Sequence, residues 1–284
     1  DSLTPASVTC MTKHFSGGGP QKDGWDAHFK YGKEQVYPGN NFDYHLAPFK
    51  AAIKAETAQI MPYYGIPVGQ TSEDVGFAFN KEIITGLLRN KLGYNGVVCT
   101  DWGVISSIGI LGYTIVEAKD HGVEHLSPKE KVLKALNAGV DQFGGEYVPH
   151  LIAELVKDGK VPEARIDKSV ARLLRLKFKL GLFDNPYVDL DKTRELCGKA
   201  EFVEAGKEAM AKSTVLLKNE GGNGMALLPL QQGTKIYAKG MDKAVFKDFG
   251  ETVDDLARAD VAVLSLKAPY EPRSGFLESI FHQG

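Results

Sequence analysis

The segment Gly93–Trp102, GYNGVVCTDW, contains the features that decide the fold. A helical pattern ends at Gly93, and the apolar run over 96–100 that follows it predicts a buried strand. Asp101 and Trp102 come directly after this run, so a carboxylate stands at the C-terminal end of the strand. A helix that leads into a buried strand is the repeating unit of parallel α/β folds.

The same alternation continues on both sides of this segment. Apolar residues at helical spacing and β-type runs follow one another, as expected for βα units on a parallel sheet. The sequence therefore predicts the α/β class. The predicted strands are 7–15, 57–65, 96–100 and 140–143, and the predicted helices are 40–55, 80–93, 128–139, 148–160 and 162–183.

A domain boundary is predicted at the segment DNPYVD, which contains Pro and Asn and has no regular period. Residues 1–183 then form a first domain, and residues 184–197 form a linker. Beyond the linker, a helical pattern is followed by strand candidates at 234–240 and 259–267. Residues 198–284 are therefore expected to be the start of a second α/β domain.

Composition and charge limit the classes of partner. Lys and Arg number 34 and Asp and Glu number 36, a formal net charge of −2, so nothing favours nucleic acid or an anionic membrane surface. No apolar run reaches the roughly 18 residues of a membrane span. The three cysteines, Cys10, Cys99 and Cys197, are too few and too scattered for a disulfide framework or a zinc site. A neutral small-molecule ligand is expected, with no cofactor and no metal.

Side chains suited to binding and catalysis stand at the ends of successive predicted strands. Because the carboxyl ends of parallel strands meet at one edge of a sheet, these groups are expected to line one site. Such hydrogen-bonding groups, aromatic rings and carboxylates suit a neutral polyhydroxylated ligand. Taken singly, Asp101 could be a turn former and Trp102 a cover for the core. The full set is Lys13, His14, Met61, Tyr63, Tyr64, Asp101, Trp102 and Glu146.

Six segments together resemble the glycoside hydrolase family 3 β-glucosidases. They are KHFSGGG, IMPYYG, GYNGVVCTDWG, LNAGVDQF, RLLRLKFKLGLFDNPY and AKSTVLLKNEGG with the LLPL that follows, and they extend over nearly the whole chain. The resemblance implies the C-terminal half of a (β/α)8 TIM-type barrel over 1–183, followed by part of an α/β sandwich domain. It also implies a retaining, exo-acting β-glucosidase that hydrolyses terminal β-D-glucosyl residues through a covalent glycosyl-enzyme intermediate.

Three other functions stay open from the sequence. The chain could belong to a β-xylosidase or a β-N-acetylglucosaminidase of the same family, or to a non-catalytic carbohydrate-binding subunit. The intact strand-end residues favour an enzyme, because a protein that only binds sugar does not need the carboxylate of Asp101. The expected partner is a small-molecule β-glucoside or oligosaccharide. A secreted or periplasmic location is favoured over a cytoplasmic one.

The resemblance implies roles for the residues at the strand ends. Asp101 corresponds to the nucleophile of the retaining mechanism. Five further residues correspond to groups that surround the sugar: Lys13 and His14 bind its hydroxyls, Tyr64 lies near the nucleophile, and Met61 and Trp102 form walls of the pocket.

The acid/base residue of a retaining enzyme is a second carboxyl about 5 Å from the nucleophile. Two-domain members of the family supply a Glu after a Pro-Tyr pair, and KAPYEPRSG puts Glu271 there with a spacing one residue shorter. Glu278 is an alternative in the same region. A third possibility is Asp26 with His28 in GWDAHF, which corresponds to the Asp-x-His of single-domain β-N-acetylglucosaminidases. Glu146 is expected to hydrogen-bond in the pocket wall or to anchor a loop.

Two features depart from the family pattern. Only four strands are predicted before the linker, whereas the family's barrel has eight, and half a barrel has unpaired edges and an open core. The other half is expected to come from another polypeptide, from a second copy of the chain in a homo-oligomer, or from residues outside this chain. The second departure is Glu56, where the family pattern has Gly.

Overall fold

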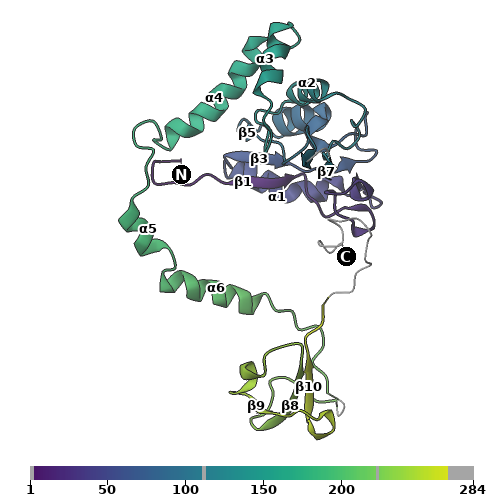
Figure 1. Ribbon diagram of the computed structural model, residues 1–284, viewed down its shortest axis with the longest axis vertical. Helices are drawn as coiled ribbons and strands as arrows, with labels where there is room; N and C mark the ends of the chain where they lie inside the picture. Colours follow the sequence, from purple (N-terminus) through teal and green to yellow (C-terminus); the bar gives the residue numbers. More distant parts are fainter. Residues whose placement is uncertain (1–2, 111–112, 222–223, 268–284) are drawn as a thin grey trace. The chain divides into compact units, whose positions relative to one another are not determined.

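The fold is that of a computed structural model, which describes residues 3–110, 113–221 and 224–267 (Figure 1). The described residues up to Tyr187 form one compact unit, and those from Val188 onward form a second. Within the described ranges, no helix is long and apolar enough to cross a membrane. The first unit contains all the strand-end residues named above.

Three parallel strands form the sheet of the first unit. They are β1 (Met11–Phe15), β3 (Gln59–Pro62) and β5 (Val97–Val98), in the order β1-β3-β5. Ile60, Val97 and Val98 are fully buried, as expected for a parallel sheet whose faces are covered. The strands predicted at 7–15, 57–65 and 96–100 are therefore present, each over a shorter range.

The prediction of a strand at 140–143 is wrong, because only a single parallel bridge joins Gln142 to Cys99 there. The Asp141 side chain accounts for this: its Oδ2 accepts the Val98 N–H at 3.0 Å, a bond that a backbone carbonyl would accept in a regular ladder. Asp141 N and Gln142 N still donate to the Val98 carbonyl, so the segment stays against β5.

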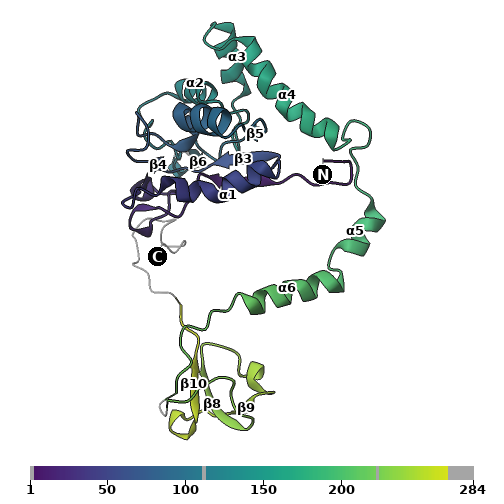
Figure 2. The same cartoon turned by 180° about the vertical axis from the view of Figure 1, so that it is seen from behind.

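Five helices accompany the sheet, each within its predicted range. They are α1 (Phe42–Lys54), η4 (Glu82–Lys91), α2 (Pro128–Ala138), α3 (Pro149–Lys157) and α4 (Glu163–Lys179). α1 lies along the sheet in Figures 1 and 2. The rings of Phe49 on α1 and Phe15 on β1 meet edge to face with 5.1 Å between their centroids. The helices therefore bury the apolar side of the strands that carry the site.

η4 is a π-helix, whereas the pattern over 80–93 predicts an ordinary α-helix. Leu92 N, for example, donates to the carbonyl of Leu87, five residues earlier. Asn80 lies two residues before the helix, and its Oδ1 accepts from Ile83 N at 3.1 Å. The wider helix still presents an apolar face to the core, formed by Ile83, Ile84 and Leu88.

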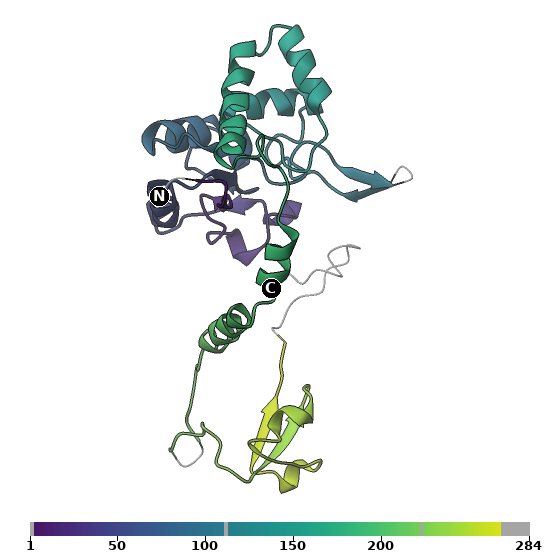
Figure 3. The ribbon, with the colours of Figure 1, turned by 90° about the vertical axis from the view of Figure 1, so that its left-hand side faces the viewer.

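Short elements that the sequence analysis does not predict connect these strands and helices. β2 (Glu34–Gln35) pairs with β4 (Ile66–Pro67), and β6 (Ile108–Ile110) pairs with β7 (Tyr113–Val116) in an antiparallel hairpin. Figure 3 shows this hairpin projecting from the rest of the unit. Single turns of 3-10 helix form at η1 (Lys22–Gly24), η2 (Lys30–Gly32) and η3 (Phe77–Phe79).

A buried ion cluster joins α4 to the sheet. The side chain of Asp141 is 0% exposed, and its carboxylate accepts from Arg89 on η4 at 2.5 Å and from Arg172 on α4 at 2.9 Å. Ser169 on α4 donates to the same carboxylate at 2.6 Å. Together with the Val98 N–H, these bonds connect one carboxylate to β5, η4 and α4.

Glu56 lies just beyond α1 and has a φ of 59°, in the left-handed region that favours glycine. This explains why the family pattern has Gly at the position. We expect Glu56→Gly to raise the free energy of unfolding by about 1 kcal/mol, because it removes the close approach of Cβ to the backbone. Urea denaturation measures the difference. Glu56→Ala keeps Cβ and is the control, so equal gains in the Gly and Ala variants would contradict this explanation.

The second unit contains α5 (Leu190–Leu196), α6 (Ala200–Lys212) and a parallel sheet. The strands of this sheet lie in the order β10-β8-β9 and are β8 (Thr234–Lys239), β9 (Gly250–Thr252) and β10 (Val261–Leu264). The 3-10 turns η5 (Lys243–Phe246) and η6 (Leu256–Arg258) lie between them in the chain. The segment 184–197, expected to be a linker, contains α5.

Candidate active site

Asp101 lies three residues beyond Val98, the last residue of β5, and residues at or just beyond the ends of all three strands contact it. Its Oδ2 lies 3.2 Å from His14 Nε2 on β1. Its Oδ1 accepts from the Tyr64 hydroxyl, just beyond β3, at 3.0 Å and from Trp102 N at 2.7 Å. The residue is 8% exposed. The structure therefore brings together four of the residues that the strand-end argument places at one site.

These contacts favour the ionised form of Asp101. Burial alone raises the pKa of this carboxyl, because the charged form loses contact with water. Hydrogen bonds from His14, from Trp102 N and from Tyr64 outweigh burial and leave the pKa of Asp101 below its ordinary value. Asp101 is therefore a carboxylate at neutral pH, with donors on both of its oxygens.

Tyr64 is a buried donor in this arrangement. Its hydroxyl lies 3.0 Å from Asp101 Oδ1 and 2.7 Å from the Trp102 carbonyl oxygen, so it donates to one of them at a time. Burial raises the pKa of the Tyr64 phenol, and the charge of Asp101 raises it further. The phenol therefore stays protonated and available as a donor.

Trp102 is 54% exposed, and part of its ring is covered by backbone. A Cβ added at Gly144 would lie 2.4 Å from two carbon atoms of the indole, and one at Gly145 would lie 2.8 Å from two others, so the close approach requires glycine at both positions. Gly144 N donates to Thr100 Oγ1 at 2.9 Å, which fixes this loop beside the end of β5. The supported and exposed indole is suited to contact the apolar face of a ligand.

Lys13 and Met61 lie opposite each other in the ladder between β1 and β3. Met61 is buried, whereas Lys13 is exposed. In the part of the chain that the structure describes, the Lys13 ammonium has neither a hydrogen bond nor an ion pair. It is therefore available to a ligand.

Asp26 and His28 lie beside the same group of residues. His28 Nδ1 lies 2.7 Å from Asp26 Oδ1, and His28 N donates to this oxygen at 2.8 Å. The His28 ring meets the Tyr64 ring edge to face, with 4.9 Å between their centroids. Burial raises the pKa of the Asp26 carboxyl, but the bonds from His28 outweigh it and leave the pKa below its ordinary value. Tyr64, which contacts both His28 and Asp101, therefore connects this pair to Asp101.

The three other candidate carboxylates, Glu146, Glu271 and Glu278, have no described contact with Asp101. Glu146 anchors a loop, because its Oε1 accepts from Ile105 N at 2.7 Å and from Ser106 N at 3.1 Å. This is one of the two roles expected for it. Glu271 and Glu278 lie outside the described residues.

The segment 118–121, AKDH, contacts two loops of the site, although no strand-end pattern in the sequence predicts it. Lys119 N donates to the Gly103 carbonyl at 2.8 Å, just after Trp102 in the chain. His121 Nε2 lies 2.7 Å from the Ala27 carbonyl oxygen in the GWDAHF loop. The one signal in the sequence is a run of three ionisable residues, which is equally typical of a solvated loop.

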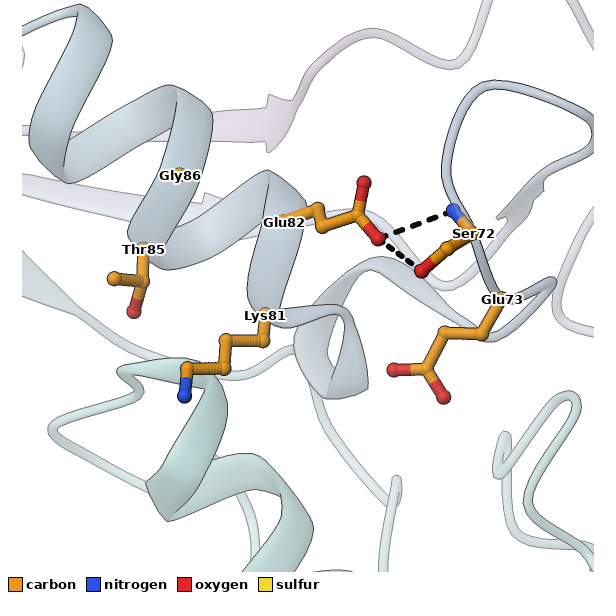
Figure 4. Close-up of a pocket in the computed structure, with 6 residues that line it drawn as sticks. All are labelled: Ser72, Glu73, Lys81, Glu82, Thr85 and Gly86. Atoms are coloured by element: carbon orange, nitrogen blue, oxygen red, sulfur yellow. Dashed lines mark hydrogen bonds between the residues drawn. The ribbon is translucent and has the colours of Figure 1, made fainter.

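A separate pocket of about 390 Å³ lies at the start of η4 (Figure 4). Its carboxylates already have partners, since Glu82 accepts from Ser72 and Glu73 accepts from Lys134. No group of three or more His, Cys, Asp or Glu side chains among the described residues is placed to hold a metal ion. The lining residues, all distinct from those around Asp101, are Ser72, Glu73, Lys81, Glu82, Thr85 and Gly86.

Comparison with known proteins identifies the family. Residues 1–176 match the family model of the glycosyl hydrolase family 3 N-terminal domain. The chain belongs to glycoside hydrolase family 3. It is 49% identical over 286 residues to β-glucosidase C of Emericella nidulans, and the match covers 99% of this chain and 46% of that protein. It is 37% identical over 300 residues to the periplasmic β-glucosidase/β-xylosidase of Dickeya chrysanthemi, and the match covers 100% of this chain and 45% of that protein. The chain spans about half the length of these family 3 relatives.

A solved β-glucosidase structure has a similar fold. The β-glucosidase from Listeria innocua in complex with glucose matches 82% of this chain and 29% of its own, with a TM-score of 0.64 and 26% identity. The present chain therefore has the mixed α/β fold of family 3 β-glucosidases.

Proposed function

We propose that the protein containing this chain is a retaining, exo-acting β-glucosidase with Asp101 as its nucleophile. The observation that carries the proposal is the ionised Asp101 carboxylate at the end of β5, with donors on both oxygens. A retaining mechanism needs a carboxylate that is charged and fixed in position before it attacks the anomeric carbon. Membership of family 3 and the β-glucosidase names of the relatives support the same activity.

The proposed reaction has two steps. In the first, an Asp101 oxygen bonds to the anomeric carbon, the bond to the leaving oxygen breaks, and the acid/base carboxyl transfers its proton to that oxygen. In the second, the acid/base carboxylate takes a proton from water, the water oxygen bonds to the anomeric carbon, and Asp101 leaves as a carboxylate. His14 and Tyr64 stabilise the charge of Asp101 before the first step and after the second.

The sugar in this proposal lies against the side chains around Asp101. Lys13 and His14 bind its hydroxyls, and the exposure of Lys13 supports its part. Trp102 forms one wall, which its exposed indole supports, and Met61 forms another. The substrate is a small β-glucoside or oligosaccharide whose terminal glucose occupies this space.

Glu271 is proposed as the acid/base, with Glu278 and the Asp26–His28 pair as alternatives. The Pro-Tyr pair before Glu271 supports the first choice. The contact between His28 and Tyr64 supports the Asp26–His28 pair, since it puts that carboxylate near Asp101. In each case the carboxyl must come within about 5 Å of the nucleophile in the working enzyme.

The fold-level proposal is that residues 1–183 are the C-terminal half of a (β/α)8 barrel and residues 198–284 the start of an α/β sandwich domain. The parallel order β1-β3-β5 with helices between the strands supports the first part, and the parallel sheet β10-β8-β9 supports the second. The remaining barrel strands are proposed to come from another chain, a second copy or residues outside this chain. A secreted or periplasmic location is also proposed, and the name of the Dickeya relative supports it.

Covalent trapping tests the proposed function. The probe is 2,4-dinitrophenyl 2-deoxy-2-fluoro-β-D-glucoside: fluorine slows both steps and the good leaving group restores only the first, so the glycosyl ester accumulates. We expect the peptide that contains Asp101 to gain the mass of one fluoroglucosyl group, measured by mass spectrometry after proteolysis. The variant Asp101→Asn, incubated in the same way, should stay unlabelled.

Two results would contradict the assignment. A label on another carboxylate would show a different nucleophile. No label, together with no hydrolysis of nitrophenyl glucosides, would favour a non-catalytic binding subunit. Nitrophenyl xylosides and N-acetylglucosaminides in the same assay separate the remaining alternatives, and we expect the glucoside to be hydrolysed fastest.

A further inference from the structure

Lys119 is a buried lysine whose ammonium has no hydrogen bond or ion pair to any described residue. It is 9% exposed. The neighbouring Asp120 is buried as well but pairs with the buried Lys131 at 2.6 Å. Lys119 Nζ is not one of the fully buried side-chain atoms that lack a partner, so the ammonium reaches solvent and can donate to a bound molecule.

Asp101 is the carboxylate that acts most strongly on Lys119. Burial lowers the pKa of Lys119, and Asp101 opposes this effect more than Glu117 does. Glu117 is exposed and pairs with Lys30 at 2.9 Å, so Asp101 is the buried carboxylate of the two. The backbone bond from Lys119 N to Gly103 holds the segment 118–121 against the loop that follows Asp101.

Lys119 and Asp101 nevertheless form no ion pair. The oxygens of Asp101 are already bonded to His14, Tyr64 and Trp102 N, and Lys119 Nζ lies beyond ion-pair distance from them. A cation that acts on a carboxylate without touching it can bind a third group that also lies beside that carboxylate. A neutral molecule rich in hydroxyl oxygens provides acceptors for this ammonium.

We propose that Lys119 is a further substrate-binding residue, whose ammonium donates a hydrogen bond to one hydroxyl oxygen of the sugar held at Asp101. The inference rests on the proposed function for the presence of a sugar beside Asp101. A hydrogen bond from a charged donor is about twice as strong as a neutral one, so this contact adds substantially to affinity. Lys119 becomes the second cation of the site, supplied by a different loop from that of Lys13.

The experiment measures sugar binding by Lys119→Met with isothermal titration calorimetry, using glucose and its monodeoxy analogues. Binding is independent of turnover, so the result does not require catalysis. We expect Lys119→Met to bind glucose about 10- to 100-fold more weakly than wild type, because a charged hydrogen bond is lost. At one ring position, the loss of affinity on removing the hydroxyl should be present in wild type and absent in Lys119→Met.

Lys131→Met is the matched control, because it removes the buried ammonium that pairs with Asp120. It should lower stability but leave the effect of every deoxy substitution unchanged. If Lys119→Met retains all the deoxy effects of wild type, Lys119 has only a structural role and the proposal is overturned. Should this variant fail to fold, Lys119→Leu, which also has no side-chain donor, provides the same comparison.

The outcome is distinguishable from failure of the proposed function. Suppose that wild type binds glucose and that Lys119→Met lacks one of the deoxy effects, but that wild type is not labelled by the fluoroglucoside. The β-glucosidase assignment then fails while the role of Lys119 stands. If wild type is labelled at Asp101 and Lys119→Met keeps every deoxy effect, the reverse holds. A wild-type protein that binds no glucose and takes no label contradicts both.

Discussion

Asp101→Asn is expected to lower kcat for a nitrophenyl β-glucoside by about 10³-fold or more, with the fold unchanged. The amide carries no charge and cannot form the glycosyl ester, whereas its size and its acceptor for Trp102 N are retained. Steady-state kinetics measure the loss, and circular dichroism checks the fold. A kcat within about tenfold of wild type would be incompatible with Asp101 as the nucleophile.

Asp43→Asn is the matched control for this variant. It makes the same chemical change on α1, where Asp43 is exposed and lies 3.6 Å from Lys50. Its kcat should equal that of wild type. A comparable loss in both variants would mean that the effect does not belong to Asp101 in particular.

Acid denaturation of the same variant checks the direction of the Asp101 pKa. Because folding lowers this pKa, Asp101 contributes stability at pH values above its unfolded pKa of about 3.9, and the contribution is lost as the pH falls through the lower folded value. The free energy of unfolding of wild type should therefore fall more steeply over this acid range than that of Asp101→Asn. Parallel curves would mean that the carboxyl has an ordinary pKa.

Asp141→Asn is expected to lower the free energy of unfolding of the first unit by about 3–5 kcal/mol. The change removes the charge that compensates Arg89 and Arg172, and it leaves two guanidinium groups near a buried neutral amide. Both tryptophans of the chain, Trp25 and Trp102, lie in this unit, so their fluorescence in a urea titration follows its unfolding.

Asp43→Asn also serves as the control for this loss of stability, because Asp43 lies in the same unit. Asp43 pairs with Lys50 at 3.6 Å, but both side chains are largely exposed. Exposed pairs contribute about 0–1 kcal/mol, so this variant should be close to wild type. A loss at Asp141 no larger than that at Asp43 would show that burial of the cluster adds nothing to stability.

The strands of the first unit could be predicted where apolar runs are bounded by glycine or polar residues, as at 96–100. The segment 140–143 has the same local appearance, but the Asp141 side chain bonds to Val98 N, a long-range contact that no local pattern contains. The π form of η4 could not be predicted either, because its apolar residues occur at spacings that an α-helix also uses. The hairpin over 108–116 depends on pairing between segments with no strong strand signal.

The candidate site was more predictable than the connections around it. His14, Tyr64 and Trp102 were expected near Asp101 because parallel strands bring their carboxyl ends to one edge, and this rule needs only the strand ends. Lys119 was missed because it follows no predicted strand, and its position depends on where the loop after the β6–β7 hairpin returns. Burial of a lysine cannot be read from its neighbours in the sequence.

The glycine pair Gly144 and Gly145 limits how the site around Asp101 can be altered. Since part of the Trp102 indole rests on the main chain of Gly144 and Gly145, the backbone sets its position there, and these two residues offer no side chain to enlarge or trim by one carbon at a time. Even the smallest replacement at Gly144 displaces the ring in a single step. Gradual reshaping of this site, by evolution or by protein engineering, must therefore act through other side chains around Asp101.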